Sequence, residues 1–400
     1  MINNTSASLT QLKEELRQEL DNILQFWKDH AIDESFGGFY GRVDNDNRVD
    51  TDAPKGLVLN ARILWTFSAA FNFTQEKKWL TIADRAFRFL MQYFHDPVYG
   101  GFYWSVDKAG AIVESRKQVY GIAFCIYAFA GYYKAAENND ALQHAKNCYH
   151  LLEQYSFDFG KGGYLEAFTH DWQPIRDLRL SNKDANEKKT MNTHLHVLEA
   201  YTNLYRVWKD PGLEKSIELL LENFIDHIID HSSGHLQLFF DEDWCNKGDI
   251  ISYGHDIEAA WLLLESAEVI ASKSFVEKIK KISFQLAHAA EEGLDKDGGL
   301  WYEIEDGVMV KQKHSWPQAE AMIGFFNAWQ ISGDKRYLQH VFRSWQFIQR
   351  HILDKERGEW FWGVNADYSI MEKQDKIGFW KCPYHNSRAC IEIIKRVQSK

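Results

Sequence analysis

The stretch Asp33-Glu34-Ser35-Phe36-Gly37-Gly38-Phe39-Tyr40-Gly41 contains a glycine–aromatic phrase that recurs along the whole chain and indicates the architecture. A similar phrase recurs about every 65 residues, which is the sequence signature of repeated structural units. An aspartate precedes the glycine of each copy by four or five residues, and this shared offset argues against coincidence. The six copies are Gly37-Gly38-Phe39-Tyr40, Gly100-Gly101-Phe102-Tyr103-Trp104, Gly162-Gly163-Tyr164, Gly234-His235-Leu236, Gly298-Gly299-Leu300-Trp301 and Gly358-Glu359-Trp360-Phe361-Trp362, preceded by Asp33, Asp96, Asp158, Asp230, Asp295 and Asp354.

Each repeat contains two helical patterns, one on either side of its phrase. Ahead of the first phrase, Leu12, Leu16, Leu20, Ile23 and Trp27 recur with the period of an amphipathic helix. Comparable segments are expected near 78–94, 139–156, 211–230, 274–292 and 335–353. The segments after the phrases are more uniformly apolar, as expected for buried helices. They are expected near 56–73, 118–136, 189–208, 255–272, 317–331 and 386–398.

Six buried helices and six amphipathic helices predict an all-α fold, an (α/α)6 toroid. An open solenoid would need terminal repeats with polar outer faces, and the sequence shows none. The glycine phrases suit tight turns or short β-hairpin loops, which the repeat places together on one face of the ring. No Pro/Gly/Ser-rich linker divides the chain, so residues 1–400 are predicted to form a single catalytic domain.

Composition excludes several classes of protein. The balance of 45% hydrophobic and 26% charged residues is that of a globular chain, and the net charge of −11 disfavours nucleic acid or anionic membrane as partners. No run of about 18 apolar residues and no secretory signal is present, and five scattered cysteines suit a reducing compartment. We therefore expect a cytoplasmic monomer. Its 15 Trp, 18 Tyr and 26 Phe exceed the usual demand of a core, and sugar-binding clefts are one use for them.

Polar and aromatic residues gather at the starts of the predicted inner helices, which converge on one mouth of a toroid. Taken singly, each has an ordinary structural explanation, but together they indicate a pocket. These residues are Asn60, Arg62, Tyr120, Asn192, His194, His196, His255, Glu258, Trp316, Glu320, Trp380, His385, Asn386 and Arg388.

Spacing along these helices favours proton-transfer chemistry. His255 and Glu258 stand three residues apart and share a helix face, so the carboxylate is expected to raise the pKa of the imidazole. His194 and His196 cannot chelate one metal from a helix, where they point about 200° apart, and no metal site is predicted. A glycoside hydrolase stays an alternative, because Glu258 and Glu320, or Asp256, would supply its two carboxylates.

Four phrases resemble those of the cellobiose 2-epimerases, a branch of the N-acylglucosamine 2-epimerase superfamily. They are Thr190-Met191-Asn192-Thr193-His194-Leu195-His196, Ser252-Tyr253-Gly254-His255-Asp256-Ile257-Glu258, Trp316-Pro317-Gln318-Ala319-Glu320 and Trp380-Lys381-Cys382-Pro383-Tyr384-His385-Asn386. The resemblance extends from residue 37 to Arg388. It implies an (α/α)6 barrel and a cofactor-independent isomerase that inverts C2 of the reducing-end glucose in β-1,4-linked disaccharides. Cellobiose would become glucosyl-mannose, and lactose would become epilactose.

The resemblance also implies roles for individual residues. His255 and His385 would be the acid/base pair, while Arg62 and His196 would hold the oxygens of an enediolate. Glu258 would orient a histidine or accept a sugar hydroxyl, and Glu320 would bond Arg62 or a hydroxyl. The remaining residues would bind the sugar, and they are Tyr120, Asn192, Trp316, Trp380 and Asn386.

Two enzyme alternatives and one binding alternative stay open at this point. A monosaccharide epimerase or aldose–ketose isomerase would use the same enediol, reprotonated at C1 in the second case. A hydrolase or lyase on the same toroid would depend on carboxylates. A sugar-binding protein without turnover would have no need of the clustered histidines.

Overall fold

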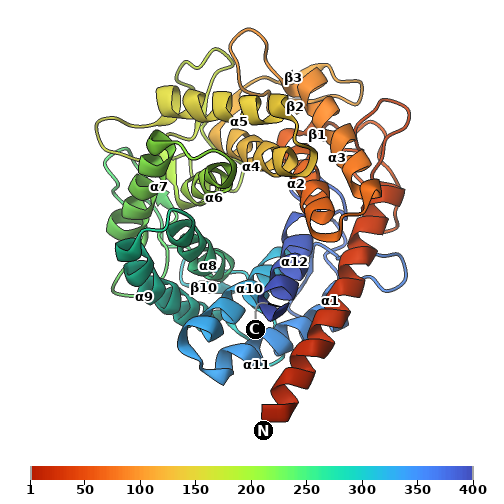
Figure 1. Cartoon of the computed structure of the whole chain (residues 1–400), viewed down its shortest axis with the longest axis vertical. Helices are drawn as coiled ribbons and strands as arrows, with labels where there is room; N and C mark the ends of the chain where they lie inside the picture. Colours follow the sequence, from red (N-terminus) through yellow and green to blue (C-terminus); the bar gives the residue numbers. More distant parts are fainter. Residues whose placement is uncertain (1, 399–400) are drawn as a thin grey trace.

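The computed structural model describes residues 2–398 and confirms the (α/α)6 toroid: two concentric sets of helices surround a common axis (Figure 1). The outer helices are α1 (Ile2–His30), α3 (Lys77–Phe89), α5 (Asn139–Leu151), α7 (Pro211–Asn223), α9 (Lys273–Ala290) and α11 (Lys335–Phe347). The inner helices are α2 (Leu57–Thr74), α4 (Val119–Ala136), α6 (Met191–Val207), α8 (Tyr253–Val269), α10 (Ser315–Ser332) and α12 (Tyr384–Gln398). The ring closes because α12 packs against α1, α2 and α10.

The inner and outer helices differ in burial as their sequences predict. In α4 the residues Val119 to Ala130 are all buried, because this helix has neighbours on every side. In α3 only one stripe is buried, including Trp79, Ile82 and Ala86, and the opposite stripe faces solvent. Four outer helices continue into one π-helical turn, and α9 continues into a 3-10 turn. These turns are η1 (Leu90–Phe94), η2 (Leu152–Ser156), η3 (Phe224–Ile228), η5 (Ile348–Ile352) and η4 (Glu291–Gly293).

Each glycine phrase forms a tight turn that a single backbone bridge closes, as between Ile32 and Phe39. Gly38 has a φ of +62°, and a Cβ there would lie 2.6 Å from the ring of Phe89, so glycine is required. The preceding aspartate explains its own recurrence: Asp33 Oδ1 accepts the N–H groups of Ser35 and Phe36.

The second carboxylate oxygen of this aspartate binds a buried lysine in five of the six repeats. The Nζ–Oδ2 distances are 2.7 to 2.9 Å. The pairs are Asp33–Lys55, Asp96–Lys117, Asp158–Lys189, Asp295–Lys313 and Asp354–Lys376. In the fourth repeat Ile251 stands at the position of the lysine, and Asp230 instead accepts the hydroxyls of Ser232 and Ser233. The lysines tie the turns to the starts of the inner helices.

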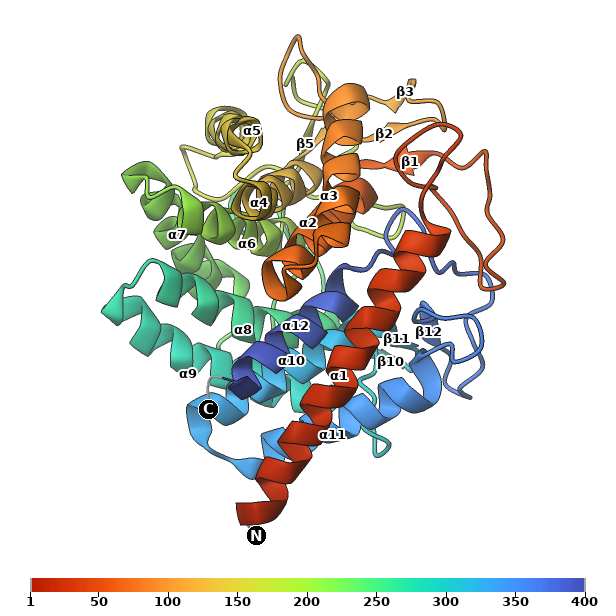
Figure 2. The same cartoon turned by 45° about the vertical axis from the view of Figure 1, so that its right-hand side comes forward.

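Short antiparallel strands gather at the N-terminal ends of the inner helices, and Figure 2 shows several of them on one side of the ring. They form the sheets β1-β2-β3, β8-β9-β10, β4-β5, β6-β7 and β11-β12. Their bounds are β1 (Lys55–Gly56), β2 (Ser105–Val106), β3 (Ile112–Glu114), β4 (Lys117–Gln118), β5 (Ala167–Phe168), β6 (Lys189–Thr190), β7 (Phe239–Phe240), β8 (Ile251–Ser252), β9 (Glu303–Glu305), β10 (Val308–Val310), β11 (Lys313–His314) and β12 (Gly363–Val364). Among the described residues, no helix has the length and apolar character to cross a membrane.

Candidate active site

A cavity of about 410 Å³ opens at the strand-bearing mouth of the ring, where the inner helices begin. Ten of the eleven residues to which the resemblance assigns roles line it. They are Arg62, Tyr120, Asn192, His196, His255, Glu258, Trp316, Trp380, His385 and Asn386. The eleventh, Glu320, is fully buried and contacts His385.

The site is built from equivalent positions of the inner helices. Asn192 and His196 are the second and sixth residues of α6, so they lie on one helix face and both reach the cavity. Arg62, Glu258 and Glu320 are the sixth residues of α2, α8 and α10. Repetition of one helix position around a ring therefore directs several ionisable groups toward a single space.

Arg62 is a buried guanidinium without a carboxylate partner among the described residues. Its Nη2 donates to the hydroxyl of Tyr120 at 2.7 Å, and its Nη1 lies 3.8 Å from the sulfur of Cys382. Its Nε has no hydrogen-bond partner within residues 2–398, and the guanidinium packs over the ring of Phe124. A desolvated cation that lines a cavity is suited to hold an anionic ligand group.

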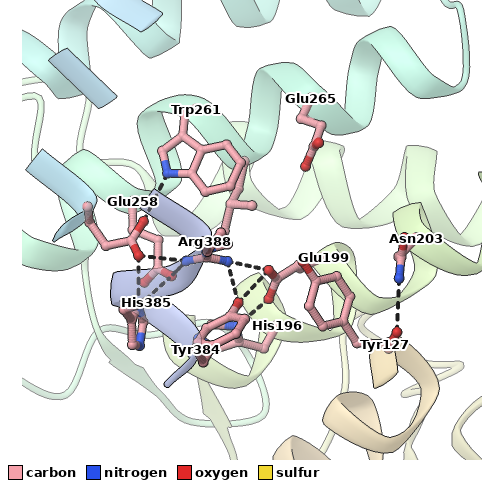
Figure 3. A network of polar contacts seen from close by, with 12 residues as sticks. Tyr127, His196, Glu199, Asn203, Glu258, Trp261, Glu265, Tyr384, His385 and Arg388 are labelled. Atoms are coloured by element: carbon pink, nitrogen blue, oxygen red, sulfur yellow. Dashed lines mark hydrogen bonds and ion pairs between the residues drawn. The ribbon is translucent and has the colours of Figure 1, made fainter. Parts of the chain in front are cut away.

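Arg388 has the opposite environment, because three carboxylates surround it (Figure 3). Its Nη2 lies 2.6 Å from Glu258 Oε1 and 2.7 Å from Glu320 Oε1, while its Nη1 contacts Glu199 and the hydroxyl of Tyr384. Glu320 therefore bonds Arg388, and the expectation that it would bond Arg62 is wrong. The guanidinium of Arg388 also packs over the rings of Trp261 and Tyr384.

His385 is oriented from beneath the cavity. Its Nδ1 lies 2.7 Å from Oε1 of Glu320. The other carboxylate oxygen of Glu320, Oε2, accepts the indole N–H of Trp261. The contact with Glu320 fixes the tautomer with hydrogen on Nδ1, and Nε2 stays available to a ligand. Burial, with the charges of Arg62 and Arg388, lowers the pKa of His385 well below its usual value, so the imidazole is neutral at pH 7.

His255 differs from the expectation based on its spacing from Glu258. Its Nδ1 lies 2.8 Å from the hydroxyl of Ser252, and no bond to Glu258 forms. Burial lowers the pKa of His255 to about 3, so the expected rise of this pKa is wrong. Among the histidines that line the cavity, His196 does pair with a carboxylate three residues on, because its Nδ1 lies 2.9 Å from Glu199 Oε2.

The carboxylates of this network do not have the arrangement of a hydrolase. In glycosidases the two carboxyl groups flank the scissile bond, about 5 Å or more apart. Here Glu258 and Glu320 bind the same nitrogen of Arg388, and Glu320 does not line the cavity. Asp256 is engaged elsewhere: it binds His235 at 2.7 Å and accepts the N–H of Leu236.

Glu258, Glu320 and His385 are also the one group of metal-ligand type found among the described residues, with atoms within 4.8 Å of one another. The same Oε1 atoms of the two glutamates already accept N–H groups from Arg388, and His385 Nδ1 bonds Glu320. The guanidinium therefore supplies the positive charge that these carboxylates require.

Aromatic side chains form the walls of the cavity. The indole of Trp316 lies against both imidazoles, with ring centroids 4.8 Å from His255 and 5.6 Å from His385. Trp380 packs against Tyr120 at 5.9 Å. Asn386 lines the same space, but its amide nitrogen donates to Glu359, which holds this side chain from behind.

The outer half of the cavity was not predicted from the sequence. Tyr302 and His314 stack there with centroids 3.9 Å apart, and the same cavity is lined by the loop residues Leu180, Ser181, Lys183 and Asp184. His314 directly precedes α10, so the rule that identified the other rim residues would have found it. The loop before β6 has neither helical period nor motif, and it gave no signal.

Several lining residues carry a buried polar atom that lacks a protein partner. These atoms are Arg62 Nε, Asn192 Oδ1, His314 Nδ1 and Trp362 Nε1. Buried polar groups are rarely left without a hydrogen bond. Donors and acceptors spread over aromatic walls are what a polyhydroxylated ligand requires.

Comparison with known proteins gives consistent matches along the chain. The family model for N-acylglucosamine 2-epimerase matches residues 38–389. A curated cellobiose 2-epimerase of Bacteroides fragilis is 46% identical over 96% of this chain and 98% of its own length, and one of Dictyoglomus turgidum is 39% identical over 96% and 99%. The solved structure of cellobiose 2-epimerase from Bacillus thermoamylovorans B4167 superposes with a TM-score of 0.93 at 41% identity, covering 97% of this chain and 100% of that one.

Proposed function

We propose, from the premise that the chain belongs to the N-acylglucosamine 2-epimerase family and is an epimerase acting on carbohydrates, that it inverts C2 of the reducing-end glucose in β-1,4-linked disaccharides. Cellobiose would become glucosyl-mannose, and lactose would become epilactose. The observation that carries this proposal is the meeting of two imidazoles and one guanidinium in a single cavity, the guanidinium having no carboxylate partner among the described residues.

The chemistry begins with opening of the sugar ring, which exposes the C1 aldehyde and makes the C2 proton acidic. One imidazole takes this proton through Nε2, and the electrons of the C–H bond move into an enediolate. The other imidazole, protonated at Nε2 by solvent, gives this proton to the opposite face of C2, which inverts its configuration, and the first imidazolium then releases its proton to solvent. Both histidines have Nδ1 engaged, by Ser252 and by Glu320, so Nε2 is the nitrogen that each presents.

Arg62 would stabilise the negative charge that develops on the enediolate oxygens. Its desolvated guanidinium has donor capacity to spare, since Nε has no partner. His196 donates its Nδ1 hydrogen to Glu199, so its Nε2 would accept a hydrogen bond from a ligand hydroxyl beside Arg62. An anion bound here also favours the cationic form of a histidine, which the returning proton transfer requires.

The aromatic walls would hold the sugar rings. Trp316 and Trp380 offer apolar faces to the C–H side of the reducing-end pyranose, with Tyr120 and Asn192 binding its hydroxyls. The second glycosyl unit would lie in the outer half, against Tyr302 and His314. Every step is a proton transfer that side chains perform, so we propose that no metal or redox cofactor takes part.

Substitution of each histidine tests this assignment. His255→Asn and His385→Asn are expected to fold and to lose at least about a hundredfold in kcat for cellobiose, the usual scale of acid–base catalysis. His288→Asn is the matched control, because His288 lies exposed on α9 outside the cavity. Near wild-type turnover in both cavity variants would refute the proposal. Conversion of mannose to fructose without action on cellobiose would support the isomerase alternative.

A further inference from the structure

We propose that Glu258 works as a neutral carboxylic acid that donates a hydrogen bond from Oε2 to a sugar oxygen, and that Glu199 and Glu320 stay ionised. The proposal rests on the proposed function for the identity of the sugar. Its structural basis is the unequal sharing of donors among three buried carboxylates around Arg388. It replaces the expectation that Glu258 accepts a hydroxyl.

The donors are divided unevenly. Glu320 accepts three, from Arg388, His385 and Trp261. Glu199 also accepts three, from Arg388, Tyr384 and His196. Glu258 accepts one within the described residues, from Arg388 to Oε1, and its other oxygen is free to carry hydrogen. A carboxylate with several donors is favoured as the anion, so a shared proton settles on Glu258.

The balance of buried charge also places the proton on Glu258. Two cations lie in this part of the ring, Arg388 and Arg62, and the latter packs 4.8 Å from the ring of Tyr384. Three ionised glutamates would leave one buried negative charge uncompensated, and such a charge takes up a proton instead. With Glu258 protonated, two anions face two cations.

The groups around Glu258 come from every neighbouring inner helix. They are Arg62 on α2, Tyr120 on α4, His196 and Glu199 on α6, His255 on its own α8, Glu320 on α10, and Tyr384, His385 and Arg388 on α12. Burial and the charge of Glu320 raise the pKa of Glu258 to about 8, despite Arg388. Burial raises the pKa of Glu320 also, so the two share one proton, and the three donors to Glu320 place that proton on Glu258. For Glu199 burial opposes ionisation, but Arg388 and the bond from His196 outweigh it and lower the pKa to about 2.

The position of Glu258 gives its proton a use. Glu258 lines the cavity, whereas Glu320 does not. A neutral acid can donate to the developing C1 or C2 oxyanion, where an ionised carboxylate would repel it. The two glutamates thus have different tasks: Glu320 orients His385, and Glu258 faces the ligand.

Glu258→Gln is the decisive variant, because an amide is neutral and offers a donor in the place of the acid. Infrared difference spectra between the wild type and E258Q at pH 6.5 are expected to show loss of one carboxylic-acid carbonyl band. The control Glu222→Gln, at an exposed position outside the cavity, is expected to lose a carboxylate band instead. This readout needs no substrate, so it stands even if the chain does not act on cellobiose.

Kinetics with cellobiose give the second readout. E258Q is expected to keep about a tenth or more of kcat/KM, while E258A and E320Q lose about a hundredfold or more. The wild-type rate is expected to fall above pH 8, and E258Q lacks this alkaline decline. Loss of a carboxylate band in E258Q, or activity as low as that of E258A, would overturn the proposal.

Discussion

The two buried arginines of the site are expected to respond in opposite ways to replacement by methionine. Arg62 has no carboxylate bonded to it, and only 3% of its surface is exposed. Arg388 bonds three carboxylates and is equally buried. Methionine has a similar length and carries no charge, so each substitution removes the cation with little change in packing.

For Arg62→Met the loss falls on catalysis. Removal of one donor to an oxyanion costs about 2.7–4 kcal/mol in the transition state, so kcat/KM should fall by a factor of about 10²–10³. The free energy of unfolding should change by less than about 2 kcal/mol. The lost bond to Tyr120 costs about 1–3 kcal/mol, and the relieved desolvation of the charge offsets it.

For Arg388→Met the loss falls on stability. Three carboxylates stay behind without their common partner, and breaking a buried pair costs about 3–5 kcal/mol. Urea denaturation followed by circular dichroism, with kcat/KM for cellobiose measured on the same preparations, checks both variants. An R62M protein that is destabilised as much as R388M, or that keeps its activity, would contradict this interpretation.

Three further predictions concern stability and the outer cavity. Burial lowers the pKa of His194 from 6.5 to about 4, and the pKa values of His255 and His314 from 6.5 to about 3. Below pH 6.5 the unfolded chain therefore binds more protons than the folded chain. The free energy of unfolding should fall as the pH is lowered from 6.5 to 4. His314→Gln should reduce this slope, measured by denaturation at several pH values, by about 1.4 kcal/mol per pH unit, and an unchanged slope would contradict the burial argument. Lys117→Met should cost about 3–5 kcal/mol of stability by leaving Asp96 buried and unpaired, whereas a loss below 1 kcal/mol in a urea titration would mean that the pair is dispensable. Tyr302→Ala should raise KM for cellobiose several-fold with little change in kcat, because its stack on His314 contributes about 0.5–1.5 kcal/mol, and steady-state kinetics showing a kcat effect alone would place Tyr302 in the chemistry.

Much of the fold follows from patterns visible in the chain. The glycine phrase with its aspartate fixed six repeats, and the helical period of segments such as Leu12–Trp27 separated outer from inner helices. The lysines that bind these aspartates also recur, since Lys55, Lys117, Lys189 and Lys313 each stand two residues before an inner helix. This recurrence is a further sequence signal of the repeat.

The site could be predicted as a set of residues but not as a network. Helix starts identified His255, His385 and Arg62, because a toroid brings those starts together. Sequence spacing favoured a bond from His255 to Glu258, whereas Ser252, three residues earlier on β8, takes its Nδ1. Which neighbour binds a given side chain depends on how each helix is rotated about its axis. The spacing of residues within one helix does not determine that rotation.

The central claim is most directly tested by incubating the protein with cellobiose in heavy water and recording NMR spectra of the reducing-end sugar. We expect a mannose-type reducing end that carries deuterium at C2, formed at the same rate in the presence of a metal chelator. Release of free glucose, or a mannose-type product that keeps hydrogen at C2 throughout, would contradict inversion by proton exchange between two histidines.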